Sequence, residues 1–238
     1  MSIEIEGQLS SAERQFLVET LRGLPQKPER VVEVGTWLGG GSTLHILRTL
    51  HENRAGHLWG VEADRRIYEK MIANLRAALP EALDRFTPLF GFSEDVLPRW
   101  LAGLPDGDRI DFVFLDGGNN PAEQILEFQL LDPRIRPGGV LMAHDARVRK
   151  GKWLVPYLGQ LDHWETRVLD LSELGLLSAR KIKEQPSEQC RRAAERTLRR
   201  LRREPIELVG ALLPSWFCGM VIRSLPKPVT NYLYRGRK

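Results

Sequence analysis

Acidic and imidazole side chains directly follow two apolar runs near the middle of the chain. Asp116 comes after the run DFVFL, and the pair His144 and Asp145 comes after GGVLMA. If these runs are neighbouring parallel strands, their carboxyl ends meet at the sheet edge where ligands bind in open α/β folds. Two carboxylates and an imidazole suit Mg²⁺, Mn²⁺ or Fe²⁺ better than a structural zinc. We therefore predict a catalytic and metal-binding cluster of these three residues, against the alternative that His144 hydrogen-bonds within a loop and Asp145 caps the next helix.

A glycine-rich segment, EVGTWLGGGS at residues 33–42, follows another apolar run and precedes a helical pattern. Glycines let the backbone approach a ligand closely, and a helix N-terminus offers free N–H groups to an anion. The spacing departs from the G-x-G-x-x-G pattern, which argues against a dinucleotide pyrophosphate. The alternative is a tight strand-to-helix turn without a ligand.

Two further segments present polar groups where predicted strands end. Glu62 ends the run GVE, and its two carboxylate oxygens suit the two hydroxyls of a ribose. Ser93 and Glu94 follow the predicted strand at 86–90 and could hydrogen-bond the edge of a purine. A local role is compatible with this, in which Ser93 caps the next helix and Asp95 lies in its first turn.

The apolar pattern places these groups on alternating strands and helices. Ser10 and Glu13 have the spacing of a capping box, which starts a first helix. We expect strands at residues 30–35, 57–64, 86–90, 108–116 and 138–145, and helices at 42–53, 65–79, 95–104 and 121–131. This alternation predicts an α/β fold with a parallel sheet covered on both faces. Two strand-like runs within 164–182, joined by a short loop, predict a hairpin that ends the sheet with an antiparallel strand.

Composition excludes several classes of protein. The chain has 238 residues, of which 42% are hydrophobic, so it can form a core and is not disordered throughout. Two cysteines are too few for a disulfide framework or a cysteine-based zinc module and fit a reducing compartment. The polar N-terminus does not resemble a signal peptide, and the longest uncharged run, residues 208–222, is shorter than the roughly 20 residues that span a bilayer. We expect a cytoplasmic protein.

The positive charge is concentrated toward the C-terminus. Residues 1–146 hold 15 Lys and Arg against 22 Asp and Glu, whereas residues 147–238 hold 20 against 9. We expect a separate basic helical extension at 184–238, with arginines on one side of a helix at 187–203 and an apolar segment from Pro205 to Ile222. By default the arginines form a solvated face or a contact with a second copy of the chain. The extension could also lie on an anionic membrane or cover an acidic substrate. Nucleic acid is not expected, because the basic run lacks interleaved aromatic side chains.

The ordered set of motifs resembles a known family. EVGTWLGGGS, GVEAD, GFSEDVLP, DFVFLDGG and RPGGVLMAHDA occur in the order and spacing of class I S-adenosylmethionine-dependent methyltransferases, and most resemble the branch of catechol and bacterial small-molecule O-methyltransferases. The resemblance covers about residues 31–183. It implies a Rossmann-like sheet of seven strands, mostly parallel with an antiparallel last strand, in a methyltransferase domain at 1–183.

The resemblance also implies roles for individual residues. The cofactor S-adenosylmethionine would meet the glycine-rich turn with its methionine end, Glu62 with its ribose, and Ser93 and Glu94 with its adenine, while Asp116 would lie near the sulfonium. The implied cofactor-binding residues are Glu33, Gly35, Thr36, Gly39, Ser42, Glu62, Ser93, Glu94 and Asp116.

This sequence departs from the family pattern at the expected catalytic centre. The family's metal ligands are typically an Asp followed by an Asp-Asn pair, and the pair corresponds to His144 and Asp145 here. A lysine base found in the catechol enzymes corresponds to Asn119. Three hypotheses remain open: a divalent metal such as Mg²⁺ acidifies the acceptor hydroxyl, His144 or Asp116 acts as the base, or the acceptor differs in kind.

The sequence therefore predicts methyl transfer from S-adenosylmethionine to an oxygen of a small molecule. Two functions from other classes remain as alternatives. One is a nicotinamide-dependent oxidoreductase on the same fold, which the glycine spacing disfavours. The other is a non-catalytic module that binds a membrane or a partner through its basic C-terminus.

Overall fold

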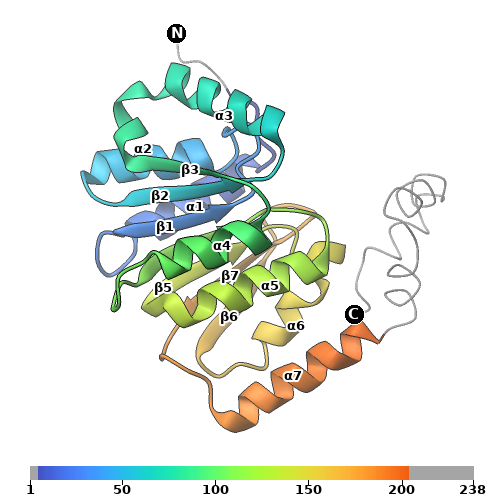
Figure 1. Ribbon diagram of the computed structural model, residues 1–238. Helices are drawn as coiled ribbons and strands as arrows, with labels where there is room; N and C mark the ends of the chain where they lie inside the picture. Colours follow the sequence, from blue (N-terminus) through green and yellow to red (C-terminus); the bar gives the residue numbers. More distant parts are fainter. Residues whose placement is uncertain (1–4, 204–238) are drawn as a thin grey trace, which may run out of the picture.

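A computed structural model describes residues 5–203 of the chain. They form one seven-stranded sheet with the order β3-β2-β1-β4-β5-β7-β6 (Figure 1). Neighbouring strands from β3 to β5 pair in parallel, and β7 runs antiparallel to both β5 and β6. The predicted fold class is confirmed, because only the last strand in the sequence is antiparallel to the others.

The elements follow the predicted alternation closely. The strands are β1 (Arg30–Val34), β2 (His57–Glu62), β3 (Phe86–Phe90), β4 (Ile110–Leu115), β5 (Ile135–Ala143), β6 (Trp164–Leu169) and β7 (Leu176–Lys181). The α-helices are α1 (Ser11–Arg22), α2 (Thr43–Asn53), α3 (Arg65–Ala78), α4 (Ser93–Ala102), α5 (Pro121–Leu131), α6 (Leu154–Leu158) and α7 (Glu188–Arg202). Short 3₁₀ helices are η1 (Pro80–Arg85), η2 (Asp132–Arg134) and η3 (Arg149–Lys152).

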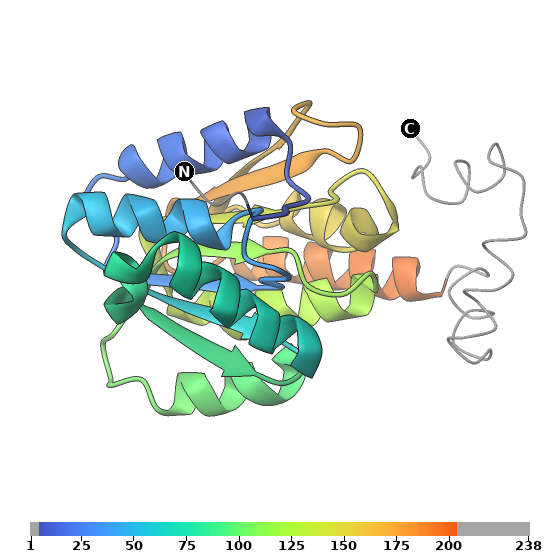
Figure 2. The same ribbon diagram turned by 90° about the horizontal axis from the view of Figure 1, so that it is seen from above.

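Alternate residues of the central strands face two separate cores. On β4, Phe112 and Phe114 pack with apolar residues of α1, α2 and α3, while Val113 and Leu115 pack with those of α4, α5, α6 and α7. Side chains of a strand alternate between its two faces, so a strand buried on both sides is apolar throughout. Helices α1 and α4 accordingly lie on opposite sides of the sheet (Figure 2). This sandwich fixes the carboxyl ends of β1, β2, β4 and β5 side by side.

The first helix begins with the predicted capping box. Ser10 Oγ accepts a hydrogen bond from the Glu13 backbone N–H, and Glu13 Oε2 accepts one from the Ser10 N–H. Glu13 is nevertheless buried, and its Oε1 accepts a hydrogen bond of 2.6 Å from Ser172 in the β6–β7 loop. The capping residue therefore also ties the N-terminal helix to the hairpin at the other end of the chain.

Helix α4 differs from the prediction at its start. It begins at Ser93 with Phe92 as its N-cap, two residues before the predicted start, and no side chain caps it. The Ser93 hydroxyl donates instead to Glu127 Oε1 at 2.7 Å. The capping role suggested for Ser93 is therefore wrong, because Ser93 is the first residue of the helix and Phe92 holds the N-cap position.

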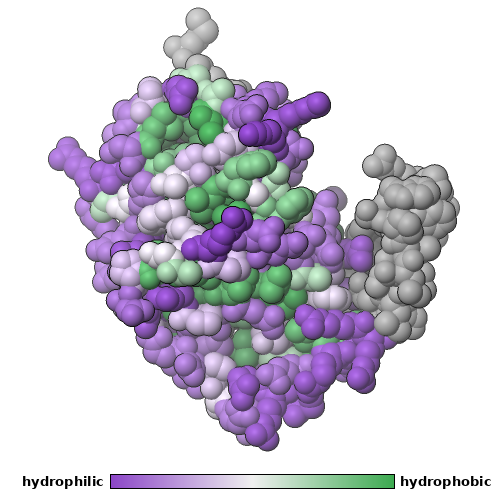
Figure 3. All heavy atoms as spheres, viewed as in Figure 1, coloured by the Kyte–Doolittle hydropathy of each residue, from purple (hydrophilic) through white to green (hydrophobic). Residues whose placement is uncertain are grey.

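Helix α7 is part of the core on its side of the sheet. Ala194, Leu198 and Leu201 are buried in the same apolar cluster as α6, and all the arginines of residues 191–203 are exposed. Hydrophilic residues cover α7 at the lower edge of the molecule (Figure 3). The predicted arginine face is thus confirmed, whereas the apolar segment from Pro205 to Ile222 lies outside the described residues. Among residues 5–203, no helix is long and apolar enough to cross a membrane.

We predict that α7 contributes strongly to the stability of the domain. Leu198→Ala removes a side chain that is 5% exposed, and such truncations cost about 2–5 kcal/mol of the free energy of unfolding. Arg192→Ala on the exposed face is the matched control and should change it by less than about 0.5 kcal/mol. Denaturant unfolding of the full-length protein measures both. Equal, small effects of the two substitutions would show that α7 is dispensable to the core.

Candidate active site

A cavity of about 530 Å³ opens at the carboxyl ends of β1, β2 and β4. Its wall combines the glycine-rich turn, the ends of these strands and the start of α4. Eight of the predicted site residues line it: Gly35, Thr36, Ser42, Glu62, Ser93, Glu94, Asp116 and Asp145. Three others, Glu33, Gly39 and His144, are not among the residues that line the cavity.

Backbone crowding explains the glycines of the turn. Gly35 has a φ of +86°, and a Cβ atom there would lie 2.3 Å from the Asp116 carbonyl oxygen. This glycine therefore allows the ends of β1 and β4 to approach each other beside the cavity. Gly40 has a different role, since a Cβ atom would lie 2.2 Å from the Ile5 carbonyl oxygen. The N-terminal segment thus packs on the turn, and it adds Gln8 and Leu9 to the cavity wall.

Glu33 supports the turn from within the sheet. Its side chain is fully buried, and its Oε1 accepts a short hydrogen bond from the Ser42 hydroxyl. Burial raises the pKa of Glu33 to about 7, although the Ser42 hydrogen bond opposes the shift. Ser42 is the N-cap residue of α2, but its hydroxyl accepts no backbone hydrogen bond, so the first N–H groups of that helix lack a side-chain partner from their N-cap.

Two groups at the cavity wall have the geometry expected of a ligand site. Glu62 Oε2 accepts the Trp37 N–H at 2.9 Å and Oε1 accepts the Asp64 N–H at 3.0 Å, so the carboxylate is held in one orientation. The Thr36 Oγ1 atom is buried and has no hydrogen-bond partner within the described residues. Buried polar groups are rarely left without partners, so the orphaned hydroxyl fits a polar group of a bound ligand.

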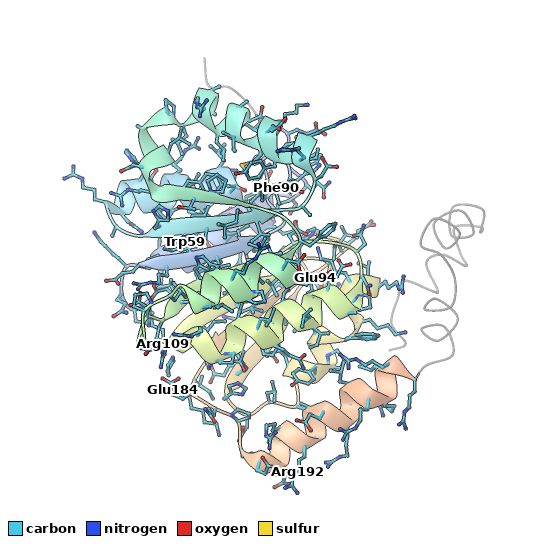
Figure 4. All side chains as sticks on the ribbon, in the orientation of Figure 1. Trp59, Phe90, Glu94, Arg109, Glu184 and Arg192 are labelled. Carbon is cyan, nitrogen blue, oxygen red and sulfur yellow. The ribbon has the colours of Figure 1, made fainter. Side chains whose placement is uncertain are left out.

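The far wall of the cavity is formed by the β3–α4 connection. Glu94 lies in the first turn of α4, and Phe90 ends β3 (Figure 4). Phe92 between them is 63% exposed and lines the cavity. Glu127, from α5, is buried beside Ser93, and burial raises its pKa to about 7. An aromatic ring beside hydrogen-bonding groups is a surface that suits a flat heterocycle.

The predicted cluster at the ends of β4 and β5 is present. Ligating atoms of Asp116, His144 and Asp145 lie within 4.8 Å of one another. His144 Nδ1 lies 3.4 Å from Asp116 Oδ1 and 3.3 Å from Asp145 Oδ1, and its Nε2 lies 3.3 Å from Glu13 Oε1. The convergence predicted from the sequence is therefore confirmed, and a third carboxylate from α1 joins it.

These carboxylates determine the charge of the imidazole. Burial alone would lower the pKa of His144, but Asp116, Asp145 and Glu13 outweigh it and raise this pKa to about 11. His144 is therefore charged at neutral pH and cannot accept a proton from an acceptor hydroxyl. This geometry argues against His144 as the general base and leaves Asp116 as the candidate among the predicted residues.

Lys150 is the fifth member of the cluster, and it was not predicted from the sequence. Its side chain is 3% exposed, and its Nζ lies 2.8 Å from Asp116 Oδ1 and 3.5 Å from Asp145 Oδ2. A cation thus already contacts two of the three predicted metal ligands, and both nitrogens of His144 face carboxylates. The ligand atoms are close enough together to hold a divalent metal. With the Lys150 ammonium between the two carboxylates, however, the residues do not fit one.

Other residues of the site also escaped the sequence analysis. The family pattern places a lysine at the position of Asn119, whereas Lys150 reaches the cluster from η3, after β5. Glu123 and Glu127 on α5 line the cavity, and Glu13 was interpreted only as a cap. The sequence does show a lysine, next to Gly151, shortly after the strand that ends at His144 and Asp145. No rule of spacing, however, predicts that this lysine contacts Asp116.

Part of the sequence matches a known protein family. Residues 32–146, which include the glycine-rich turn and end just after Asp145, match a family model described as a methyltransferase domain. The chain contains a methyltransferase domain. The resemblance predicted from the motifs is thereby confirmed. No curated protein matches the sequence significantly.

Solved structures agree with the fold of the methyltransferase domain. The O-methyltransferase TomG from Streptomyces achromogenes, involved in tomaymycin synthesis and solved with S-adenosylmethionine, is 21% identical, with a TM-score of 0.59 over 74% of this chain and 82% of that one. An O-methyltransferase from Bacillus cereus in complex with S-adenosylhomocysteine is 20% identical, with a TM-score of 0.60 over 73% and 82%. A methyltransferase from Geobacter sulfurreducens is 18% identical, with a TM-score of 0.57 over 74% and 80%. At these identities the likeness establishes the fold.

We predict that His144 remains protonated far above the range of an ordinary histidine. Its pKa is raised from 6.5 to about 11, so its charge contributes stability that is complete below pH 6.5 and is lost as the pH rises toward 11. Nitrogen-15 NMR of the imidazole measures its protonation directly. Loss of the His144 proton near pH 6.5 would contradict the ion-paired cluster.

Proposed function

We propose that the methyltransferase domain transfers a methyl group from S-adenosylmethionine to an oxygen of a small-molecule acceptor. The observation that supports this most is the shared cavity of Glu62, the glycine-rich turn and Asp116. In this one cavity, Glu62 suits the ribose of the cofactor, the glycine-rich turn suits its methionine end, and the Asp116 carboxylate suits its positively charged sulfur. The O-methyltransferases with the same fold support oxygen as the acceptor atom.

The chain's residues have separate tasks along the cavity. The Glu62 carboxylate, already oriented by two backbone N–H groups, accepts the ribose hydroxyls. The Thr36 hydroxyl and the start of α2 face the amino and carboxylate groups of the methionine end, while Phe92, Ser93 and Glu94 face the adenine. When bound, S-adenosylmethionine supplies an electrophilic methyl group on a positively charged sulfur. Asp116 favours that charge from the end of β4.

The transfer itself needs alignment and one proton acceptor. The acceptor oxygen forms a bond to the methyl carbon while the carbon–sulfur bond breaks, and the sulfur keeps the electron pair. The hydroxyl proton passes to a carboxylate of the cluster, for which Asp116 is our candidate because His144 already carries two protons. Holding the acceptor in line with the methyl group accounts for much of the acceleration in reactions of this kind.

The two alternatives from other classes receive less support. A nicotinamide-dependent oxidoreductase binds a pyrophosphate against the backbone of its glycine-rich turn. Here the N-terminal segment packs closely on Gly40 of that turn, in the place where a pyrophosphate would have to bind. A purely non-catalytic module leaves the cavity, its oriented Glu62 and the buried ionised cluster without a role.

We also propose that the basic extension contacts a second subunit or an anionic membrane. Seven arginines between residues 191 and 203 are exposed, and only Glu188 and Glu195 pair with them within α7. Arg192 extends outward from this helix (Figure 4). Replacing Arg192, Arg196 and Arg199 with Gln should abolish salt-sensitive sedimentation with anionic vesicles if the membrane is the partner, and should lower the oligomeric mass if it is a subunit. No change in either would remove α7 as a contact surface.

We predict that Glu62→Ala weakens binding of S-adenosylhomocysteine at least about tenfold. The substitution removes two charge-assisted hydrogen bonds, each worth roughly 1.5–3 kcal/mol, and about 1.4 kcal/mol corresponds to a factor of ten. Calorimetric titration of the full-length protein measures the affinity. Glu69→Ala, an exposed carboxylate on α3 outside the cavity, should bind as tightly as the unaltered chain. Unchanged affinity in Glu62→Ala would exclude the ribose assignment.

A further inference from the structure

Lys150 is buried at the centre of the proposed active site. A lysine is almost never fully buried unless it is paired, and this one is 3% exposed with carboxylate oxygens of Asp116 and Asp145 at 2.8 and 3.5 Å. Lys150 also lines the cavity, so its ammonium faces both the carboxylates and the space for the acceptor.

The backbone after β5 fixes this position. Asp145 has a left-handed φ of +63°, and its carbonyl oxygen accepts hydrogen bonds from the N–H groups of Val148 and Gly151. A Cβ atom on Gly151 would lie 2.5 Å from the Ala146 carbonyl oxygen, so only glycine allows the chain to close this tightly. The closed loop directs Lys150 back toward the strand end from which the chain has just emerged.

The contacts within the cluster already involve the atoms that a metal would need as ligands. Asp116 and Asp145 each bind the ammonium, and each also lies within 3.4 Å of His144 Nδ1. A divalent cation would have to displace the ammonium or lie against it, and it would repel both cationic side chains. The imidazole has no nitrogen that is free of a carboxylate neighbour.

We propose that the ε-ammonium of Lys150 occupies the place of a divalent cation between Asp116 and Asp145, and that methyl transfer by this domain is metal-independent. The inference rests on the proposed function for its role in catalysis, although not for the geometry. The ammonium donates a hydrogen bond to the acceptor oxygen and holds it beside the carboxylate that receives its proton. An acceptor with a single hydroxyl suffices, because an ammonium does not require the two adjacent oxygens that chelate a metal.

Mn²⁺ itself is the probe that tests the inference, because the electron paramagnetic resonance signal of the free ion disappears on binding. The full-length protein should leave the signal unchanged, and so should Lys150→Arg, which keeps the positive charge. Lys150→Met removes the charge at similar size, so the freed carboxylates should now bind a single Mn²⁺. Adding Asp116→Asn to Lys150→Met should abolish that binding. Circular dichroism establishes that each variant is folded.

Two results would overturn the inference. One is binding of a single Mn²⁺ by the unaltered protein that Asp116→Asn abolishes, since the ammonium would then not exclude the metal. The other is a folded Lys150→Met protein that binds no Mn²⁺, since the lysine would then not occupy a cation site. Calorimetric titration of S-adenosylhomocysteine into the same samples tests the proposed function separately, because the absence of cofactor binding would refute that function whatever the Mn²⁺ signal shows.

Discussion

Five charged side chains, largely shielded from water, meet at the carboxyl ends of β4 and β5, and each of them lies against a side chain of opposite charge. Glu13, Asp116 and Asp145 are negative, while His144 and Lys150 are positive. A buried charge without a partner is strongly destabilising, and breaking a buried pair typically costs about 3–5 kcal/mol. The five residues therefore have to be assembled together, and they come from α1, β4, β5 and η3.

This requirement joins parts of the chain that are distant in sequence. Glu13 reaches the cluster because the segment before α1 packs on the glycine-rich turn, and its carboxylate also accepts a hydrogen bond from the Ser172 hydroxyl in the β6–β7 loop. Lys150 reaches it because the chain closes tightly after β5. The same contacts hold the Asp116 carboxylate in place beside the space proposed for the sulfonium. Stability and chemistry thus depend on one set of charges, since loss of any partner would leave a carboxylate or a cation unpaired next to the cavity.

Patterns within one element could be predicted from the sequence, and contacts between distant segments could not. The double-sided burial of β4 is visible in its unbroken apolar run, and Glu62, Asp116 and Asp145 were predicted because parallel strands place their carboxyl ends at one edge. The hydrogen bond of Ser93 was not predicted, because no local rule shows that the carboxylate of Glu127, 34 residues later, accepts it. Lys150 was missed for a similar reason, since its approach to Asp116 depends on the left-handed Asp145 and the crowded Gly151.

A crystal structure of the full-length protein with S-adenosylhomocysteine, grown in the presence of Mg²⁺, tests the account most directly. We expect the ribose hydroxyls on Glu62, the sulfur beside Asp116, and the Lys150 ammonium between Asp116 and Asp145 with no metal density there. A ligand that avoids Glu62 would contradict the proposed cofactor site. A metal ion bound by Asp116, His144 and Asp145, with Lys150 turned away, would contradict the charge cluster on which the account depends.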